Sequence, residues 1–392
     1  MSAFALTDEQ LAYVREVREV AVQELLPLAE RGPEGTVNRP LLEAMGKHGL
    51  LSRLFGSSGR SAAAMELCLL RETLATVCTE AETALALQAL GSYPFFLFGT
   101  EEQAGRYRDG VAAGTVIASF ALSETEAGSD AAALRLRAEP DGTGWRLTGE
   151  KTWISNAPEA DVYTVFARTT AEARARGITA FVVAGDAPGL TGEHLDMLAP
   201  HAIGRLTFDG VRVEQADVLG EVDAGFKVAM RTLDVLRPSV GAFAVGMAQA
   251  ALDAAIEHTT GRQAFGGVLS DQQAVSHLLA EMATRVEASR LLVYAAASAI
   301  DNGAAASELT RKAAMAKLFA TESAQFVVDA AVQLHGARAL QRGHLLERLY
   351  RDVRAPRIYE GASEVQRTII GRSLVQAATG PAGQAGLGGR EA

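Results

Sequence analysis

Hydrophobic positions recur at helical spacing through the N-terminal part of the chain. Thr7 and Gln10 form a capping-box pattern directly ahead of the first apolar stripe, and Pro33 ends that segment. The stripe consists of Leu11, Val14, Val17, Ala21, Leu25 and Leu28. Further Ala- and Leu-rich helical patterns follow it. The pattern predicts an N-terminal all-α domain over residues 1–114.

The pattern changes over residues 115–220. Segments there are short, alternating and rich in β-branched residues, as in TVIASFAL, DVYTVFART and RLTFDGVRV. The dipeptides Asp141-Gly142 and Asp209-Gly210 are turn signals that we expect to separate strands. This stretch predicts a middle β domain with mostly antiparallel strands, either a small barrel or a sandwich.

Helical spacing returns over residues 221–375. Residues 270–300 contain no Pro or Gly, and one helix of that length would span about 45 Å. Long helices with short connections are typical of an antiparallel bundle, here of the four-helix type. The Gly- and Ala-rich residues 376–392 are expected to form a disordered tail. The fold class expected is therefore α+β multidomain, in the order helical domain, β domain, helical bundle.

Composition narrows the class of protein. Of the 392 residues, 48% are hydrophobic, as in a well-packed globular chain, and the net charge of −10 argues against a nucleic-acid partner. No basic region precedes an apolar one at the start, and no run approaches the roughly 20 apolar residues of a membrane helix. We therefore expect no signal peptide, no membrane insertion and a cytoplasmic location. The only two cysteines, Cys68 and Cys78, are expected to be buried thiols.

Common catalytic signatures are missing from the sequence. There is no GxGxxG after a strand, no Walker A loop, no HExxH and no GxSxG. His258, His277 and His335 fall in helical patterns, where a structural role is the commoner one. A nicotinamide, ATP or metal enzyme is disfavoured, and no metal ligand is predicted.

Three separated segments have unusual polar content. The first is FALSETEAGSD at residues 120–130, rich in hydroxyls and backbone donors that suit an anion or the edge of a heterocycle. The second is GEKTWISNAPEAD at residues 149–161, where Trp153 and Ser155 share one side of a predicted strand. The third is RDVRAPRIYEGASEVQR at residues 351–367, which puts Glu360 in a turn before a Gly. Taken singly, a polar hairpin loop, a core Trp and a solvated Glu are the default interpretations.

Together these segments resemble the acyl-CoA dehydrogenase family of FAD-dependent enzymes. The resemblance covers about residues 6–374 and is most specific in SETEAGSD, GEKTWISNA, GRQAFG with the following QQAV, and RDVRAPRIYEGASEVQR. It implies an oxidoreductase of fatty acid metabolism that is a flavoprotein, with the flavin between the β domain and the bundle. It also implies an electron-transferring flavoprotein as partner and a homo-oligomer, a tetramer or a dimer.

The resemblance also implies which residues bind the cofactor. The positions expected to contact the flavin are Phe120, Leu122, Ser123, Gly128, Ser129, Trp153, Ile154 and Ser155. Those expected to contact the adenine dinucleotide are Arg262, Phe265, Gln272, Gln273, Gln333, Leu334, Gly336, Ala337, Gly361, Ala362 and Glu364. In the family some of the dinucleotide contacts come from a neighbouring subunit.

Glu360 matches the family's catalytic base. By resemblance it removes the α-proton of an acyl-CoA-type thioester while the β-hydride passes to flavin N5, which gives the trans-2-enoyl thioester. The backbone N–H of Glu360 and a ribityl hydroxyl would support the developing enolate oxygen. One subgroup carries its base on a bundle helix instead, at the position that is Leu236 here, and leucine accepts no proton. The residues expected to contact the substrate are Ser129, Asp234, Arg237, Tyr359 and Gly361.

Several positions depart from the family pattern. Glu126 stands where Gly is usual and adds a charge, Ala362 replaces a Thr after the base, and Ala337 replaces a Gly. The stretch of residues 303–308 has no Arg to meet a CoA phosphate. These changes leave open an acyl-carrier thioester and a biosynthetic role. They also leave open a relative that reacts with oxygen, as oxidase or monooxygenase, or a non-catalytic flavin or acyl-thioester binding protein. The apolar residues 83–93 fit an aliphatic acyl group without fixing its length.

Overall fold

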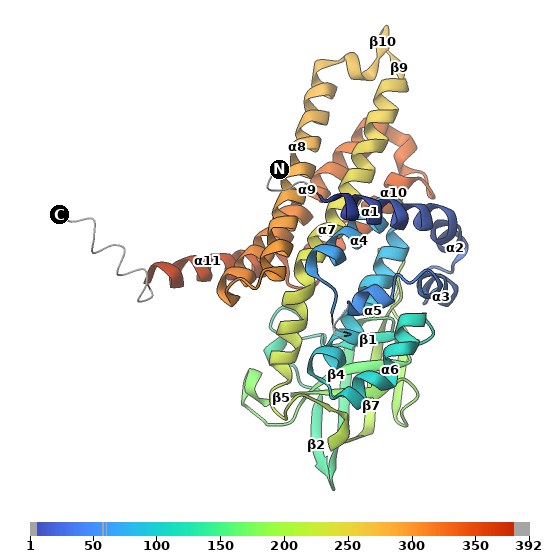
Figure 1. The fold of residues 1–392 in the computed structure, drawn as a ribbon. Helices are drawn as coiled ribbons and strands as arrows, with labels where there is room; N and C mark the ends of the chain where they lie inside the picture. The colour runs from blue at the N-terminus through green and yellow to red at the C-terminus, as the bar shows by residue number, and fades with distance from the viewer. Residues whose placement is uncertain (1–5, 57–58, 60, 380–392) are drawn as a thin grey trace, which may run out of the picture. The chain divides into compact units, whose positions relative to one another are not determined.

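The computed structural model describes residues 6–56, 59 and 61–379. These divide into two compact units. Figure 1 labels the helices and strands and colours the chain from its N-terminus to its C-terminus. The N-terminal unit is Leu6–Leu236, and the C-terminal unit begins at Arg237. The predicted three-part architecture of helical domain, β domain and helical domain is confirmed, with the first two parts inside the N-terminal unit.

Helices form the first part of the N-terminal unit. They are α1 (Asp8–Val20), α2 (Leu26–Arg31), α3 (Arg39–Lys47), α4 (Ala64–Val77), α5 (Thr79–Phe98) and α6 (Glu101–Ala113), with a π-helical turn at Ala21–Leu25. The predicted capping box is present, since Thr7 Oγ1 accepts from Gln10 N–H and the Gln10 side chain accepts from Thr7 N–H. Of the predicted stripe, Val17, Ala21 and Leu25 are buried in the core, and the others are less so.

Both cysteines are buried and neither is in a disulfide, as expected. Cys78 has a further role, because its sulfur accepts from Ala81 N–H and so caps the first turn of α5. Burial raises the pKa of this thiol to about 12, with Glu80 contributing. Cys78 is therefore an unreactive thiol at neutral pH.

The middle part is an eight-stranded sheet. Its strands are β1 (Ala118–Ala121), β2 (Arg137–Asp141), β3 (Gly144–Ser155), β4 (Val162–Arg168), β5 (Ile178–Ala184), β6 (Leu190–His194), β7 (Ile203–Glu214) and β8 (Val218–Leu219). The order is β6-β7-β3-β2-β4-β5-β8, with β1 beside β4. Only the pairings of β4 with β1 and with β2 are parallel, so the sheet is mostly antiparallel, as predicted. Helix α5 packs on β1 and β4.

The two predicted Asp-Gly turns have different outcomes. Asp141 and Gly144 pair across a tight hairpin between β2 and β3, so the first turn is confirmed. The second prediction is wrong, because Asp209 and Gly210 lie inside the single strand β7. There the register against β3 shifts, and Gly210 takes a φ of 66°, so the pair forms a β-bulge.

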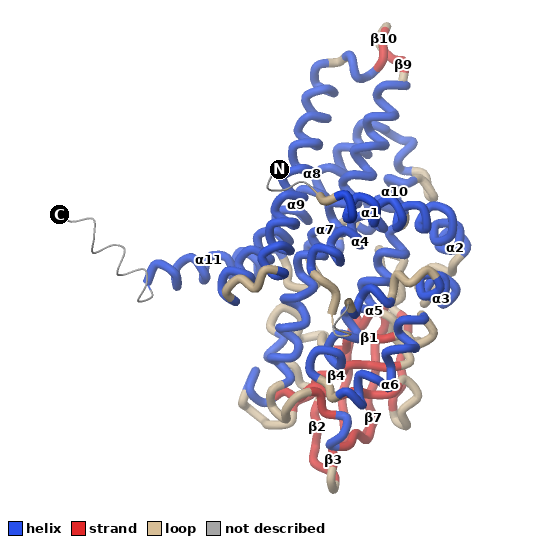
Figure 2. Tube along the Cα trace, viewed as in Figure 1, coloured by secondary structure: helices blue, strands red, loops and turns tan. Residues whose placement is uncertain are grey.

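The C-terminal unit is built on long helices. It contains most of α7 (Gly225–Gly261), followed by α8 (Gln273–Asp301), α9 (Ala306–His335), α10 (Leu345–Asp352) and α11 (Ser363–Thr379). A short hairpin of β9 (Gln263–Ala264) and β10 (Gly267–Val268) joins α7 to α8 at their far end (Figure 2). Helix α9 packs against α8, α10 and α11. The helix predicted at residues 270–300 is confirmed as α8.

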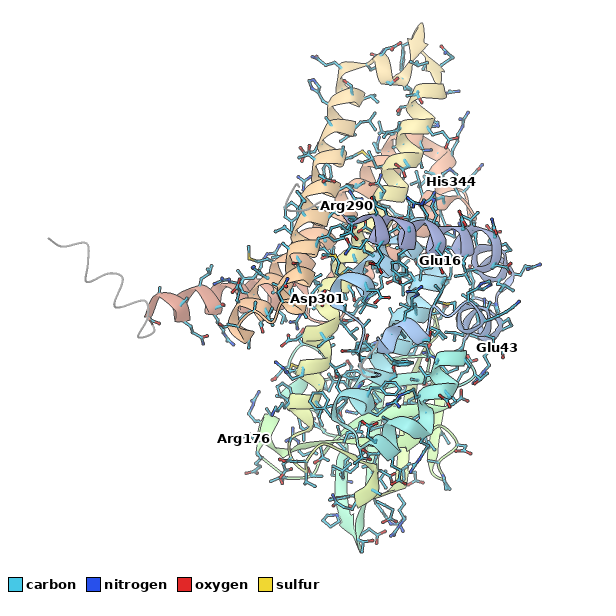
Figure 3. The ribbon with its side chains drawn as sticks, in the orientation of Figure 1. Glu16, Glu43, Arg176, Arg290, Asp301 and His344 are labelled. Carbon is cyan, nitrogen blue, oxygen red and sulfur yellow. The ribbon has the colours of Figure 1, made fainter. Side chains whose placement is uncertain are left out.

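Helix α7 packs closely on the same bundle. A Cβ built on Gly241 would meet the Val293 side chain of α8 at 2.7 Å and the Ala316 carbonyl of α9 at 3.5 Å. Farther along, Arg290 of α8, labelled in Figure 3, donates to Gln249 of α7 at 2.8 Å. By length and composition alone α7 could cross a membrane, which corrects the sequence-based expectation that no segment could. However, 78% of its most apolar window is buried inside the protein, as in a core helix.

The end of the chain differs in part from the expected tail. Of residues 376–392, the first four are the last turn of α11. Residues 380–392 lie outside the described part of the chain.

Candidate active site

The loop at residues 120–130, here called the β1 loop, leaves the sheet at the end of β1. Its base is fixed to β3, since Thr152 N–H donates to the Ser123 carbonyl at 3.0 Å. A fully buried lysine of β3, Lys151, donates to the Leu122 carbonyl at 2.9 Å and to Glu124 Oε1 at 2.8 Å. The Glu124 carboxylate also accepts the backbone N–H groups of Arg135 and Leu136. The β1 loop is therefore pinned by a buried ion pair with all its polar atoms engaged.

Burial lowers the pKa of Lys151 to about 8, against the opposing attraction of Glu124. Outside this pinned base, the loop faces solvent: Gly128 and Ser129 are exposed, and a Cβ on Gly128 would meet nothing within 4 Å. Phe120 is half-buried and Leu122 is buried. The arrangement leaves backbone and hydroxyl groups on a rigid support, with open space above them.

Trp153 is not a core residue. Its side chain is 47% exposed, and its backbone takes a left-handed φ of 56°. The cause is local, because the register of β3 against β7 shifts between Lys151 and Ile154. Ile154 is buried between Trp153 and Ser155, which are both more exposed, as strand alternation predicts. An aromatic face and a hydroxyl thus lie at the end of β3.

Glu360 lies in a short turn between α10 and α11. We call residues 359–362 the Glu360 turn. Glu360 has a φ of 50° and Gly361 a φ of 91°, both left-handed. Gly361 is required there, because a Cβ would also come within 2.4 Å of Gln366 Nε2. A left-handed Glu is rare, so the surrounding contacts must hold it.

The contacts that hold this turn bind its carbonyl oxygens. Lys317 of α9 donates to the Tyr359 carbonyl at 3.1 Å and to the Gly361 carbonyl at 2.7 Å. Gln366 of α11 donates to the Gly361 carbonyl at 2.8 Å and to the Glu360 carbonyl at 3.4 Å. The turn is thus bound through its backbone on both sides of the Glu360 side chain.

The charged groups around Lys317 define the electrostatics of the turn. Lys317 is fully buried. Burial lowers its pKa to about 8; the Glu360 carboxylate opposes this shift, and Arg237 adds to it. Two residues expected from the sequence, Arg237 of α7 and Glu360, therefore lie in one neighbourhood with a lysine that was not expected. Asp234 is three residues before Arg237 on α7, and Leu236 beside it is buried.

A second charged residue of α9 contacts the flanks of the turn. Glu322 accepts from the Ser363 hydroxyl at 2.6 Å and forms an ion pair with Arg357 at 2.9 Å. Burial alone would raise the pKa of Glu322, but the Ser363 hydroxyl and the Arg357 guanidinium lower it overall. The carboxylate is therefore ionised at neutral pH and can hold both partners.

The expected dinucleotide residues gather at the other end of α9. His258 of α7 stacks on His335 of α9 with ring centroids 4.2 Å apart, and the edge of His344, labelled in Figure 3, is 5.5 Å from His335. This brings the end of α7, with Arg262, beside the end of α9, where the exposed Gln333, Gly336 and Ala337 and the half-buried Leu334 lie.

The hairpin between α7 and α8 supplies the rest of this set. Leu269 N–H donates to the Arg262 carbonyl at 2.9 Å and closes the hairpin. Phe265 at its tip is 89% exposed with a φ of 55°, and Gln272 and Gln273 at the start of α8 are exposed. Apart from Gly361, Ala362 and Glu364, the predicted dinucleotide residues therefore lie in one mostly exposed region of the C-terminal unit, at the ends of α7 and α9 and the start of α8.

That region is far from the Glu360 turn within one chain. Lys317, which touches the turn, and Gln333 are sixteen positions apart on the straight run of α9. At 1.5 Å per residue this is about 24 Å. Gly361, Ala362 and Glu364 are thus separated from the other dinucleotide residues with which the resemblance grouped them.

The sequence motifs did not indicate a role for Lys151, Lys317 or Glu322. A signal for Lys317 exists in AAMAKLFA, where a lysine interrupts an apolar run whose alanines turn out to be buried. In the apolar stretch of residues 83–93, which was expected to fit an acyl group, Leu85 of α5 belongs to the core and Leu87 and Leu90 are half-buried. Among the described residues, no group of three or more His, Cys, Asp or Glu side chains is arranged to hold a metal ion.

Comparison with known proteins covers almost the whole chain. Models of the acyl-CoA dehydrogenase N-terminal, middle and C-terminal domains match residues 7–115, 119–211 and 223–375. The probable acyl-CoA dehydrogenase FadE25 of Mycobacterium tuberculosis is 37% identical over 95% of this chain and 97% of its own length.

Two solved structures are similar over the same extent. Butyryl-CoA dehydrogenase from Megasphaera elsdenii superimposes with a TM-score of 0.88 at 32% identity, covering 95% of this chain and 99% of that one. The prolyl acyl carrier protein oxidase AnaB gives a TM-score of 0.88 at 27% identity, covering 94% of this chain and 100% of that one.

Proposed function

The chain belongs to the acyl-CoA dehydrogenase family of oxidoreductases, and on that premise we propose that it converts an acyl-CoA-type thioester to the trans-2-enoyl thioester with Glu360 as the base. The observation that supports this most is the Glu360 turn. A carboxylate is placed there on a left-handed residue whose neighbouring carbonyls are all bound, so the side chain is presented from a fixed backbone. Such strain is typical of functional positions.

The residues present fit an FAD molecule. The β1 loop offers Ser123, Gly128 and Ser129 on a rigid base, and Trp153 offers an exposed indole face beside Ser155. The exposed region around Arg262 and Gln333 suits the anionic and adenine portions. Bound FAD would supply the acceptor for the hydride that leaves Cβ of the substrate.

The chain's own residues would handle the proton and the substrate charge. Glu360 would take the α-proton, and its backbone N–H would donate to the thioester oxygen as negative charge develops there. Arg237 lies near enough to Lys317 to affect its pKa, and we assign it to the anionic or polar part of the thioester, with Asp234. Ser129, Tyr359 and Gly361 complete the proposed substrate contacts.

We assign the protein to a homo-oligomer. The separation of about 24 Å along α9 supports this, because one cofactor site would need the Glu360 turn of one copy and the Arg262 region of another. An electron-transferring flavoprotein is the proposed acceptor and the cytoplasm the proposed location. We also propose domain boundaries near residues 114 and 220.

Flavin reduction by a substrate panel tests the function. The purified protein should be yellow and should bleach anaerobically with at least one of butyryl-, octanoyl- or isovaleryl-CoA. Glu360→Gln should retain the yellow flavin and lose at least about a thousandfold in bleaching rate, since it removes the proton acceptor. A Glu360→Gln protein that bleaches at the wild-type rate would refute the base assignment and leave a non-catalytic or different role.

The similarity to a carrier-protein oxidase favours one alternative. In that case the thioester would be attached to a carrier protein, and oxygen would reoxidise the flavin. Peroxide formed in step with the enoyl product in air, without an acceptor protein, would support the oxidase. Turnover that requires an electron-transferring flavoprotein would exclude it.

A further inference from the structure

We propose that Lys317 and Glu322 of α9 act together as a clamp that positions the Glu360 turn for proton removal. The proposal rests on Glu360 being the base, as set out above. Both residues are positioning residues, because they touch the backbone and flanks of the turn and not the reacting atoms. No part of the family resemblance assigned them a role.

The Lys317 half of the clamp fixes the carbonyls on either side of Glu360. Its ammonium donates to Tyr359 and Gly361, so the peptide groups before and after the base are tied to one point. Charge-assisted bonds of this kind are stronger than neutral ones. They favour the left-handed conformation of Glu360, which is strained and which an unrestrained turn would leave.

A structural role alone gives a poor account of this lysine. The surrounding positions of α9, Ala313, Ala314, Ala316 and Ala320, are small, apolar and buried. A buried ammonium is costly, and an apolar residue of similar shape usually packs as well or better. Its retention is explained by the carbonyl contacts, which no apolar residue provides.

The Glu322 half secures the two ends of the same segment. Arg357 precedes the turn and Ser363 begins the helix that follows it, and both bind the Glu322 carboxylate. Arg367, one turn into α11, adds a longer contact at 3.9 Å. With Lys317 at the centre and Glu322 at the ends, α9 holds the segment against rotation in either direction.

The clamp has a pH dependence that follows from its surroundings. The charged groups near Lys317 are Glu360, Glu322 and Glu364, which favour its protonated form, and Arg237, which opposes it. Because burial lowers the pKa of Lys317 to about 8, the charge-assisted bonds weaken above that pH. The rate of flavin reduction should therefore decline above pH 8 in the wild type, and this decline should be missing in a variant without the lysine.

The test compares Lys317→Met with Lys312→Met in the full-length holoenzyme. Lys312 lies on the same helix in an exposed i,i+4 ion pair with Glu308, so it controls for loss of a lysine from α9. Lys317→Met should keep its flavin and KM, and its kcat for flavin reduction should fall about 10- to 100-fold, as for a small misplacement of a catalytic group. Lys312→Met should match the wild type. An unchanged kcat in Lys317→Met would overturn the proposal.

Hydrogen exchange tests the clamp independently of the proposed dehydrogenase function. Amides of residues 355–368 should exchange faster in Lys317→Met than in the wild type, while those of α8 stay unchanged. This readout needs no substrate, so it remains valid if no thioester reduces the flavin and the proposed function fails. Equal exchange in both proteins would overturn the clamp while leaving Glu360 as base.

Glu322→Gln gives an independent answer if Lys317→Met does not fold. The substitution keeps the side-chain size and removes the negative charge that binds Arg357. It should raise exchange in residues 355–368 and lower kcat with KM unchanged, whereas an unaltered protein by both measures would reject the clamp.

Discussion

Two buried lysines each hold one loop to which we assign a role in the reaction, and they do so in different ways. Lys151 of β3 binds one carbonyl of the β1 loop and a carboxylate, Glu124. Lys317 of α9 binds two carbonyls of the Glu360 turn, and the Glu360 carboxylate lies near enough to oppose the lowering of its pKa. Burial lowers the pKa of both to about 8.

The two lysines differ in which buried polar groups lose a partner when the lysine is replaced. Without Lys151, an ionised Glu124 stays buried with only backbone donors. Without Lys317, two neutral carbonyls lose a donor, and the half-buried Glu360 carboxylate loses a neighbouring positive charge. Lys151 should therefore matter more for folding stability, and Lys317 more for the geometry of catalysis.

Lys151→Met is expected to have the largest effect on stability. It leaves a buried charge unpaired, which costs about 3–5 kcal/mol in the free energy of unfolding. Urea or thermal unfolding of the holoenzyme would measure this. Adding Glu124→Gln to the same protein should recover part of the loss, since the charge is then gone. A loss below about 1 kcal/mol would mean that the two loops are held alike.

Lys317→Met should cost less, about 1–3 kcal/mol, from the carbonyls that it leaves unsatisfied. The same unfolding experiment measures it beside Lys151→Met. The proposed difference between the two lysines is supported if Lys317→Met unfolds at a higher urea concentration or temperature than Lys151→Met. A Lys317→Met protein that is the less stable of the two would reverse the comparison.

The pH dependence of stability tests the two lowered pKa values. A lysine with a folded pKa of about 8 and an ordinary pKa of 10.5 loses its proton in the folded state first. The unfolded chain then binds more protons, so stability should rise with pH above 8, by up to about 1.4 kcal/mol per pH unit for each lysine. Above pH 9 Cys78 acts in the opposite direction, because its folded pKa is raised from 9.0 to about 12.

The effect of the two lysines on stability should therefore be measured between pH 8 and 9. Melting temperatures measured there should rise less steeply in Lys317→Met than in the wild type. Equal slopes would show that Lys317 titrates in its ordinary range, and the clamp would then lack its pH dependence.

The smallest effect is expected from Lys312→Met on the surface of α9. Its ion pair with Glu308 is exposed, and such pairs contribute about 0.5 kcal/mol or less. A melting temperature within error of the wild type is expected. A large loss here would mean that α9 is sensitive to any lysine removed from it, and Lys317 would not be special.

Local signals predicted the fold where the chain itself decides the structure. The capping box of Thr7 and Gln10 is an interaction within one helical turn, and the hairpin at Asp141-Gly142 joins neighbouring strands. The identical dipeptide type at Asp209-Gly210 failed as a turn. The reason is non-local, because β7 pairs with β3 on one side and β6 on the other and absorbs the extra residue as a bulge.

Only the site residues that belong to sequence motifs were predicted. Glu360 and Trp153 were found by resemblance, but their left-handed backbones were not, because the partners that hold them are distant in sequence. Lys317 is 42 positions from Tyr359 and 44 from Gly361. From the helical spacing of the sequence, Lys317 is simply a polar residue in a predicted helix. Only in the folded bundle does it lie against the Glu360 turn.

The attachment of the Glu360 turn through main-chain oxygens bears on how readily the enzyme can be redesigned. Lys317 and Gln366 recognise the path of the backbone, so the side chains at Tyr359 and Ala362 do not enter into their hydrogen bonds. Of the residues beside the base, Gly361 is the one whose replacement the attachment forbids. A library that varies positions 359 and 362 and keeps Lys317, Gly361 and Gln366 should change substrate choice while the base stays in register.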